Sequence, residues 1–258
     1  MLPLLRLGPL TIQTPGLALL AGVWVALEIL SRESVRLKLN VERVYNGAFY
    51  GLIAGIAAGR LFFVATHWDS YRQSLLSILS IQPGSENLFV GLAIGAAVAF
   101  LYVRPHVASW PLLLDAIAPA LAAMAAAIAL ANAFGGDGYG TETDLPWGIE
   151  LWSARRHPTQ FYELIAALIV LAILWRWCAR WPYPGAAFLA LVVFYGSARL
   201  FLEAFRGDSW IVFGAYRGAQ VIALAAVTIA LIAIARRASP PTPSPDAKLP
   251  ASGEGEMR

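Results

Sequence analysis

Four polar side chains recur at helical spacing near the end of an apolar stretch: Tyr195, Arg199, Glu203 and Arg206. At about 100° per residue they fall on one face of a helix, and Arg199 and Glu203 form an i,i+4 pair that can neutralise itself. Because a guanidinium fork matches phosphate bidentately, this face is suited to hold a phosphate head group. The alternative is an internal ion pair that holds helices together, with Arg206 reaching the membrane interface.

A second polar region, residues 132–163, lies between apolar stretches and is rich in glycine and carboxylates. Glycines such as Gly140 permit positive φ and close ligand approach, and successive backbone N–H groups there can form an anion nest. His157 has three interpretations: a general base, a partner for phosphate, or a residue that caps the following helix. A simple glycine-rich turn is the alternative for the loop as a whole.

Two further charges lie inside apolar stretches, where ionisable groups are costly and indicate function by default. Arg60 is either part of a phosphate site or a side chain that reaches the interface. Asp115 is either functional or a buried structural carboxylate bonded to another helix. We find no spacing of His, Cys, Asp and Glu that is typical of a metal site.

The composition excludes an ordinary soluble domain. The chain has 258 residues, of which 59% are hydrophobic and 14% charged, and its mean hydropathy is +0.63. These values are typical of a polytopic helical membrane protein. The net charge of +3 is modest, and the basic residues lie between apolar spans. We therefore interpret them as charges that orient the chain in a membrane, and expect no nucleic-acid partner.

The apolar stretches predict an all-α fold with seven transmembrane helices, because a bilayer core needs about 20 apolar residues per helix. The predicted spans are 10–30, 45–66, 87–103, 109–131, 161–179, 184–205 and 214–235. Basic residues are more frequent in alternate connections, which places the N-terminus outside and the C-terminus in the cytoplasm. We expect a membrane domain over residues 1–237 and a disordered, Pro-rich cytoplasmic tail over 238–258.

The chain resembles the prolipoprotein diacylglyceryl transferase family over roughly residues 8–235. Its most specific block runs from Tyr139-Gly140 through Thr143-Asp-Leu-Pro-Trp-Gly to His157-Pro-Thr-Gln. The other matching positions are Arg60, Asp115, Pro119, Asn132, Tyr162-Glu163 and the face of Tyr195, Arg199, Glu203 and Arg206. Seven spans with the N-terminus outside also agree with that family.

The resemblance implies a multi-pass enzyme of the bacterial inner membrane. It implies transfer of diacylglyceryl from phosphatidylglycerol to the lipobox cysteine of a preprolipoprotein signal peptide, with no metal or organic cofactor. Arg199, Arg206 and Arg60 would hold the phosphate, and Glu203 would orient Arg199. Tyr195, Asn132 and Asp137 would supply hydrogen bonds, while Gly140 and His157 would help to bind the substrate.

The chain also departs from the family pattern. The family's His-Gly-Gly aligns with Val90-Gly91-Leu92, so its histidine is absent, and an essential arginine aligns with Ala129. A loop glutamate aligns with Asp137, and a tyrosine of the first span with Pro15. These departures favour a second hypothesis, a catalytically inactive relative that acts as a lipid-binding or structural subunit of a membrane complex.

Overall fold

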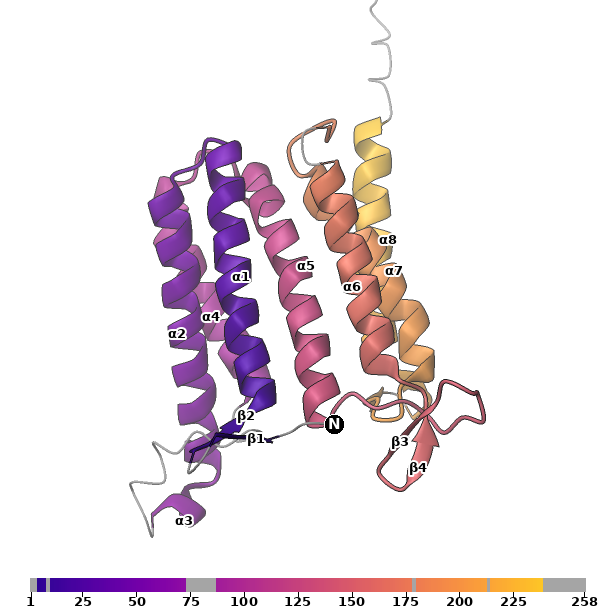
Figure 1. The fold of residues 1–258 in the computed structure, drawn as a ribbon. Coiled ribbons are helices and arrows are strands. Elements are labelled where there is room, and N and C mark those ends of the chain that lie inside the picture. Colours follow the sequence, from indigo (N-terminus) through magenta and orange to yellow (C-terminus); the bar gives the residue numbers. More distant parts are fainter. Residues whose placement is uncertain (1–3, 8–9, 73–86, 178–179, 213, 239–258) are drawn as a thin grey trace, which may run out of the picture.

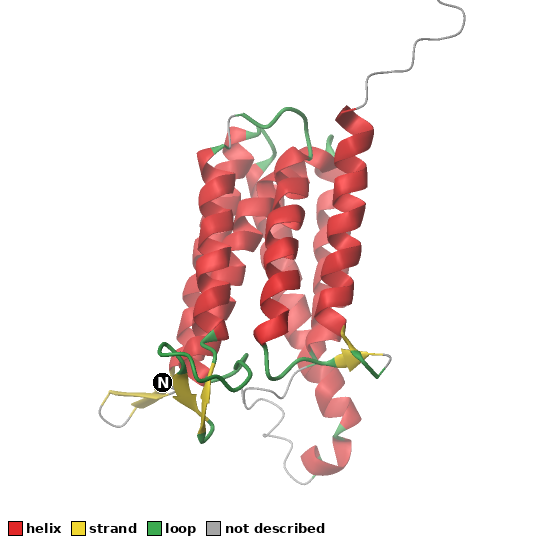
Figure 2. Cartoon of the chain, turned by 90° about the vertical axis from the view of Figure 1, so that its right-hand side faces the viewer, coloured by secondary structure: helices red, strands yellow, loops and turns green. Residues whose placement is uncertain are grey.

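The fold is a bundle of long helices with short strands at one end (Figures 1 and 2). The computed structural model describes residues 4–7, 10–72, 87–177, 180–212 and 214–238. Within these ranges seven helices are long and apolar enough to cross a membrane, which confirms the predicted number of spans. The helices are accompanied by three two-stranded antiparallel sheets that the all-α prediction did not include. The predicted tail lies outside the described residues, except that Ala238 ends the last helix.

The first described elements are two paired strands and a long helix: β1 (Leu4–Leu7), β2 (Leu10–Gln13) and α1 (Thr14–Arg36). The predicted first span, 10–30, was therefore placed too early. Proline in the first turn favours a helix start, and Pro15 occupies that position in α1. The helix continues six residues beyond the prediction because its late arginines pair with glutamates one turn earlier, as in Arg32–Glu28 at 2.7 Å.

Helices α2 (Val41–Thr66) and α4 (Leu88–Val103) pack through facing glycines. A Cβ added to Gly55 would lie 2.7 Å from the carbonyl oxygen of Gly91, so only glycine permits this approach. Small residues at such spacing are typical of close helix pairs in membranes. The short α3 (Trp68–Tyr71) follows α2, and a 3₁₀ turn, η2 (Arg104–His106), follows α4.

Helix α5 (Trp110–Gly135) is central, because it packs against α1, α6 and α7 (Figure 1). Its alanines are among the most buried residues: Ala116, Ala118 and Ala122 are 0% exposed. The helix ends where Gly136 adopts a left-handed conformation with φ 87°. Asn132 therefore lies in the last turn of α5, four residues before the loop that the sequence predicted to start there.

The second half of the chain forms three helices and two hairpins. Their bounds are β3 (Ile149–Leu151), β4 (Ala154–Arg156), α6 (Thr159–Arg176), α7 (Ala186–Leu202), η3 (Glu203–Phe205), β5 (Ile211–Val212), β6 (Tyr216–Arg217) and α8 (Gly218–Ala238). Asp115 of α5 is 5% exposed and caps α7: its two oxygens accept the N–H groups of Gly185 at 2.6 Å and Phe188 at 3.0 Å. This confirms its structural interpretation, because a carboxylate stabilises a helix N-terminus.

Candidate functional site

A buried carboxylate, Glu163 in the second turn of α6, joins two arginines from another part of the chain. Its Oε1 accepts hydrogen bonds from Nη1 of Arg199 and, at 2.8 Å, from Nη1 of Arg206. The Glu163 side chain is 7% exposed. Together with the carboxylates of Glu203 and Asp208, these residues form what we call the Glu163 cluster.

The predicted pairing of Arg199 with Glu203 is confirmed. Arg199 Nη2 lies 2.6 Å from Glu203 Oε2, while its other terminal nitrogen binds Glu163. Glu203 is only 2% exposed, and its second oxygen accepts a hydrogen bond from Ser209 at 2.8 Å. Because both terminal nitrogens of Arg199 are bound to carboxylates, its side chain is held in one orientation.

Arg206 reaches the cluster by a route that the helical projection did not predict. Helix α7 ends at Leu202, and Arg206 follows the η3 turn in an extended conformation with φ −76° and ψ 139°. Its Nε and Nη2 bind the Asp208 carboxylate at 3.0 and 2.9 Å. Burial by itself lowers the pKa of the Arg206 guanidinium, but Glu163, with help from Asp208, outweighs it and leaves the pKa above its usual value. Arg206 is therefore a permanent cation.

A third arginine, Arg217 of β6, fixes the backbone of this segment. Its Nη1 donates to the carbonyl oxygens of Glu203 and Arg206, the latter at 2.7 Å, and to Ser209 Oγ at 3.2 Å. Arg217 thereby holds the turn between the end of α7 and Arg206 in place. This role could not be predicted from sequence, because the groups that accept the Arg217 hydrogen bonds are mainly backbone atoms.

The loop after α5 packs directly on the Glu163 cluster. Thr159 Oγ1 donates to the Gly138 carbonyl at 2.6 Å, and Gln160 Nε2 donates to the Asp137 carbonyl at 3.0 Å. Gly138 has φ +63°, and a Cβ there would lie 3.2 Å from Asn132 Nδ2 and 3.4 Å from Arg206 Nη2. Donor groups of Asn132 and Arg206 thus meet at this glycine. The Asp137 side chain is exposed beside them.

Gly140 and His157 form the contact between the loop and the Arg206 segment. Gly140 pairs with Arg206 in an isolated β-bridge, and a Cβ on Gly140 would lie 2.6 Å from the His157 Cβ. The His157 ring packs on Phe205 at 5.2 Å, and its Nδ1 is buried without a hydrogen-bond partner among the described residues. The helix-cap interpretation of His157 is wrong, because the N-cap residue of α6 is Pro158.

Two predicted residues occupy other surroundings. Tyr195 lies one turn before Arg199 on α7 and packs against the apolar core of α5, α6 and α7, within electrostatic range of Arg199 and Glu163. Arg60 lies on α2 with its guanidinium 5.5 Å from the Tyr71 ring centre. Helix α2 packs on α1 and α4, on the other side of α5 from α7 (Figure 1). The described contacts therefore do not join Arg60 to the Glu163 cluster.

Comparison with known proteins decides the family. The sequence model for prolipoprotein diacylglyceryl transferase matches residues 3–236. The chain belongs to the prolipoprotein diacylglyceryl transferase family.

Individual family members are similar over most of the chain. The phosphatidylglycerol–prolipoprotein diacylglyceryl transferase of Nitrosomonas europaea is 33% identical over 206 residues, which cover 76% of this chain and 73% of the relative. The protein of the same name from Tropheryma whipplei is 30% identical over 208 residues, covering 75% and 76%. That from Corynebacterium diphtheriae is 28% identical over 192 residues, covering 66% and 68%.

Within this transferase-family fold, three of the residues that depart from the expected pattern lie in the helices α5, α4 and α1. Ala129 lies one turn before Asn132 on α5 and is 2% exposed. Val90 lies in the first turn of α4, where its N–H donates to Asn87 Oδ1 at 3.0 Å. Pro15 packs on the end of α5, since a Cβ on Gly135 would lie 3.3 Å from its Cγ.

Sequence reasoning missed the central role of Glu163, although it noted Glu163 in the block that carries the family resemblance. The sequence pattern that could have revealed this role is the position of Glu163 six residues after His157, near the start of an apolar helix. This position places a carboxylate about one turn inside a membrane span. Sequence reasoning also missed Asp208. Among the described residues, no group of three or more His, Cys, Asp or Glu side chains is placed to hold a metal ion.

Proposed function

We propose that this protein is a phosphatidylglycerol–prolipoprotein diacylglyceryl transferase of the bacterial inner membrane. Its membership of the family and the names of its relatives support this reaction. The observation that carries the proposal is the pair of guanidinium groups fixed on buried Glu163 beside the Asp137–Gly140 loop. The positive-inside pattern of the basic residues supports an orientation with this end of the bundle on the outer face and the C-terminus in the cytoplasm.

The reaction forms a thioether bond between the cysteine sulfur of the prolipoprotein and a glyceryl carbon of the lipid. The bond from that carbon to the phosphate oxygen breaks, and glycerol phosphate leaves with the bonding electron pair. Negative charge therefore grows on the phosphate while the thiol loses its proton. A site for this chemistry needs fixed cations at the phosphate and a proton acceptor near the sulfur.

Arg199 and Arg206 supply the cations. Glu163 and Glu203 hold Arg199 at both terminal nitrogens, and Glu163 also holds Arg206, so little reorganisation is needed when charge develops. The Arg206 edge that binds Asp208 is the bidentate edge that fits a phosphate. Asp208 is the most exposed carboxylate of the cluster, with 27% side-chain exposure, so it is the group that phosphate displaces.

Asp137 is the proposed acceptor of the thiol proton. Its backbone is held by Gln160, while its carboxylate is exposed next to Gly138, where Asn132 and Arg206 meet. His157 is less suited to this step, since its Nδ1 is buried behind Gly140. Asn132 completes the site as a hydrogen-bond donor.

The test is complementation of a bacterial strain depleted of its transferase, combined with transfer of labelled diacylglyceryl from phosphatidylglycerol to a lipobox peptide. We expect the wild-type chain and Arg32→Ala to support growth and transfer, because Arg32 lies at the far end of α1. Arg199→Ala should abolish both. If the folded wild-type protein gives no transfer above a membrane blank, the enzymatic proposal fails and the inactive relative is the better description.

A further inference from the structure

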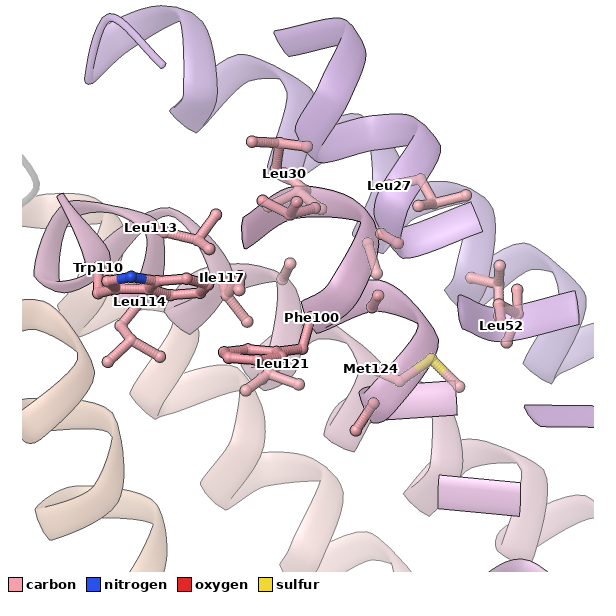
Figure 3. A pocket seen from close by; sticks show the side chains of 18 residues that line it. Leu27, Leu30, Leu52, Phe100, Trp110, Leu113, Leu114, Ile117, Leu121 and Met124 are labelled. Atoms are coloured by element: carbon pink, nitrogen blue, oxygen red, sulfur yellow. The ribbon is translucent and has the colours of Figure 1, made fainter. Parts of the chain in front are cut away.

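A large apolar cavity lies in the half of the bundle remote from the Glu163 cluster. It has a volume of about 460 Å³ and is lined by side chains of α1, α2, α4 and α5 (Figure 3). The lining side chains are aliphatic or aromatic, and include Leu27, Leu30, Leu52, Phe100, Trp110 and Leu121; their one polar N–H or O–H group is the indole N–H of Trp110. This volume lies within the range of roughly 300–1,000 Å³ for small-molecule sites. Walls that are almost entirely apolar indicate a hydrocarbon ligand.

The arrangement of the helices gives the cavity a lateral opening. Helix α5 packs on α1, α1 on α2, and α2 on α4, so the four helices form an arc whose ends, α4 and α5, flank the cavity. Lining residues at these ends remain exposed: Phe100 by 49%, Leu121 by 46% and Trp110 by 37%. In a bilayer such surfaces meet lipid. The Phe100 and Trp110 rings stack at 5.1 Å and bridge the two helices.

The depth of the cavity in the bundle indicates which leaflet of the bilayer surrounds it. Along α1 the lining runs from Val23 to Leu30, which follow Thr14 by 9 and 16 residues. At 1.5 Å per residue this is about 14–24 Å from the end that carries the Glu163 cluster. A hydrocarbon core is about 30 Å thick, so each leaflet contributes about 15 Å. The cavity thus lies almost wholly in the leaflet opposite to the proposed transferase site.

Two cations lie next to the lining residues at the end of the cavity remote from the Glu163 cluster. Arg43 precedes the lining residue Val44, and Arg104 follows the lining residue Val103. Arg43 Nη1 lies 3.3 Å from the Tyr102 hydroxyl, and its guanidinium carbon lies 6.0 Å from the Tyr102 ring centre. Among the described residues Arg43 forms no ion pair with a carboxylate. An anionic group at the membrane surface could accept hydrogen bonds from the remaining N–H groups of the Arg43 guanidinium.

We propose that this cavity binds one acyl chain of an anionic phospholipid from the leaflet remote from the Glu163 cluster, with its phosphate on Arg43 and Arg104. The apolar walls, the opening between α4 and α5, and the cations at the rim all fit that occupant. The site is separate from the proposed reaction, since none of its residues belongs to the cluster. The lipid at this site is a bound ligand that fills the cavity between the four helices and is not the lipid that reacts.

Two neighbouring alanines of α4 provide a matched test of the acyl-chain site. Ala96 lines the cavity, whereas Ala97 does not, and both are exposed. The full-length protein is exchanged into detergent, and retained lipid is counted by native mass spectrometry. We expect one retained phospholipid in the wild type and in Ala97→Phe, and about tenfold less in Ala96→Phe, which is about 1.4 kcal/mol. Equal retention in the two variants would overturn the proposal.

The head-group contact is tested with a photoreactive phospholipid that carries a diazirine on its acyl chain. With a phosphatidylglycerol probe in vesicles, we expect crosslinks on α4 and α5 that fall several-fold in Arg43→Gln. They should persist in Arg32→Gln, where the lost cation is exposed and paired with Glu28. Crosslinks that vanish in Arg199→Gln, or that form as well with a phosphatidylcholine probe, would show that the lipid belongs elsewhere or is not selected by charge.

Discussion

Replacement of Glu163 by glutamine tests whether one buried carboxylate holds both arginines. The substitution keeps the size of the side chain and one acceptor oxygen, but it removes the charge that Arg199 and Arg206 share. Glu203 and Asp208 would then be the carboxylates left to bind the two arginines. We expect Arg206 to lose its place first, because Glu163 is its one hydrogen-bond partner in α6 among the described residues.

The expected loss of stability follows from the two hydrogen bonds that Glu163 accepts from Arg199 and Arg206. Bonds to charged groups contribute about 1.5–3 kcal/mol each, and a neutral bond about 1 kcal/mol. Glutamine retains one neutral acceptor, and water compensates in part, because the arginine side chains are 21% and 16% exposed. The expected loss of stability is about 2–3 kcal/mol. For a chain of this size, that lowers the melting temperature by roughly 4–12 °C.

Activity should fall further than stability suggests. A displaced electrostatic donor typically lowers kcat by about 10²–10³, so we expect a loss of at least about 10² in transfer of labelled diacylglyceryl to a lipobox peptide. Glu142→Gln is the matched control, because Glu142 is 71% exposed and pairs with Arg156 at 3.3 Å. Its effect should stay below about 0.5 kcal/mol. The reasoning would be refuted if Glu163→Gln had the same melting temperature as Glu142→Gln and a kcat within a factor of two of that control.

Three further substitutions probe other parts of the molecule. Asp208→Asn removes the carboxylate that competes with phosphate for Arg206, and should lower KM for phosphatidylglycerol several-fold in the transfer assay; an increased KM would contradict this. Asp115→Asn weakens the cap of α7, and should lower stability by about 1–2 kcal/mol in a thermal melt, whereas an unchanged melt would show that the cap contributes nothing. Gly55→Val should abolish accumulation of folded protein on size-exclusion chromatography, because its Cβ meets backbone atoms, while Gly16→Val, with open space around it, should be tolerated.

Local spacing was enough to predict part of the site. The four-residue separation of Arg199 and Glu203 fixes their contact on any helix, and the bond is present. Composition likewise determines that seven apolar stretches span a membrane, because backbone groups in lipid must be satisfied within each helix. These predictions needed no knowledge of how the helices pack together.

The remaining features depend on contacts between distant segments. Glu163 is 36 residues from Arg199, and nothing in a single sequence indicates which helix faces will meet. Arg206 was predicted on the α7 face at helical spacing, yet the helix ends four residues earlier and the chain turns back. Arg60 satisfied the same local criteria as Arg199, but its helix packs on the other side of α5.

The helix pairs also constrain how the protein enters the membrane. Helix α2 meets α4 across glycines, and α1 packs on α5, whose first residue, Trp110, lies far along the chain. When α1 and α2 leave the ribosome and enter the bilayer, neither of these partners has been synthesised. The first two helices must therefore wait in lipid, shielded only by each other and by acyl chains, until α4 and then α5 are inserted. Biogenesis of this protein accordingly has a vulnerable interval before α5, in which a quality-control protease would meet the unassembled α1–α2 pair.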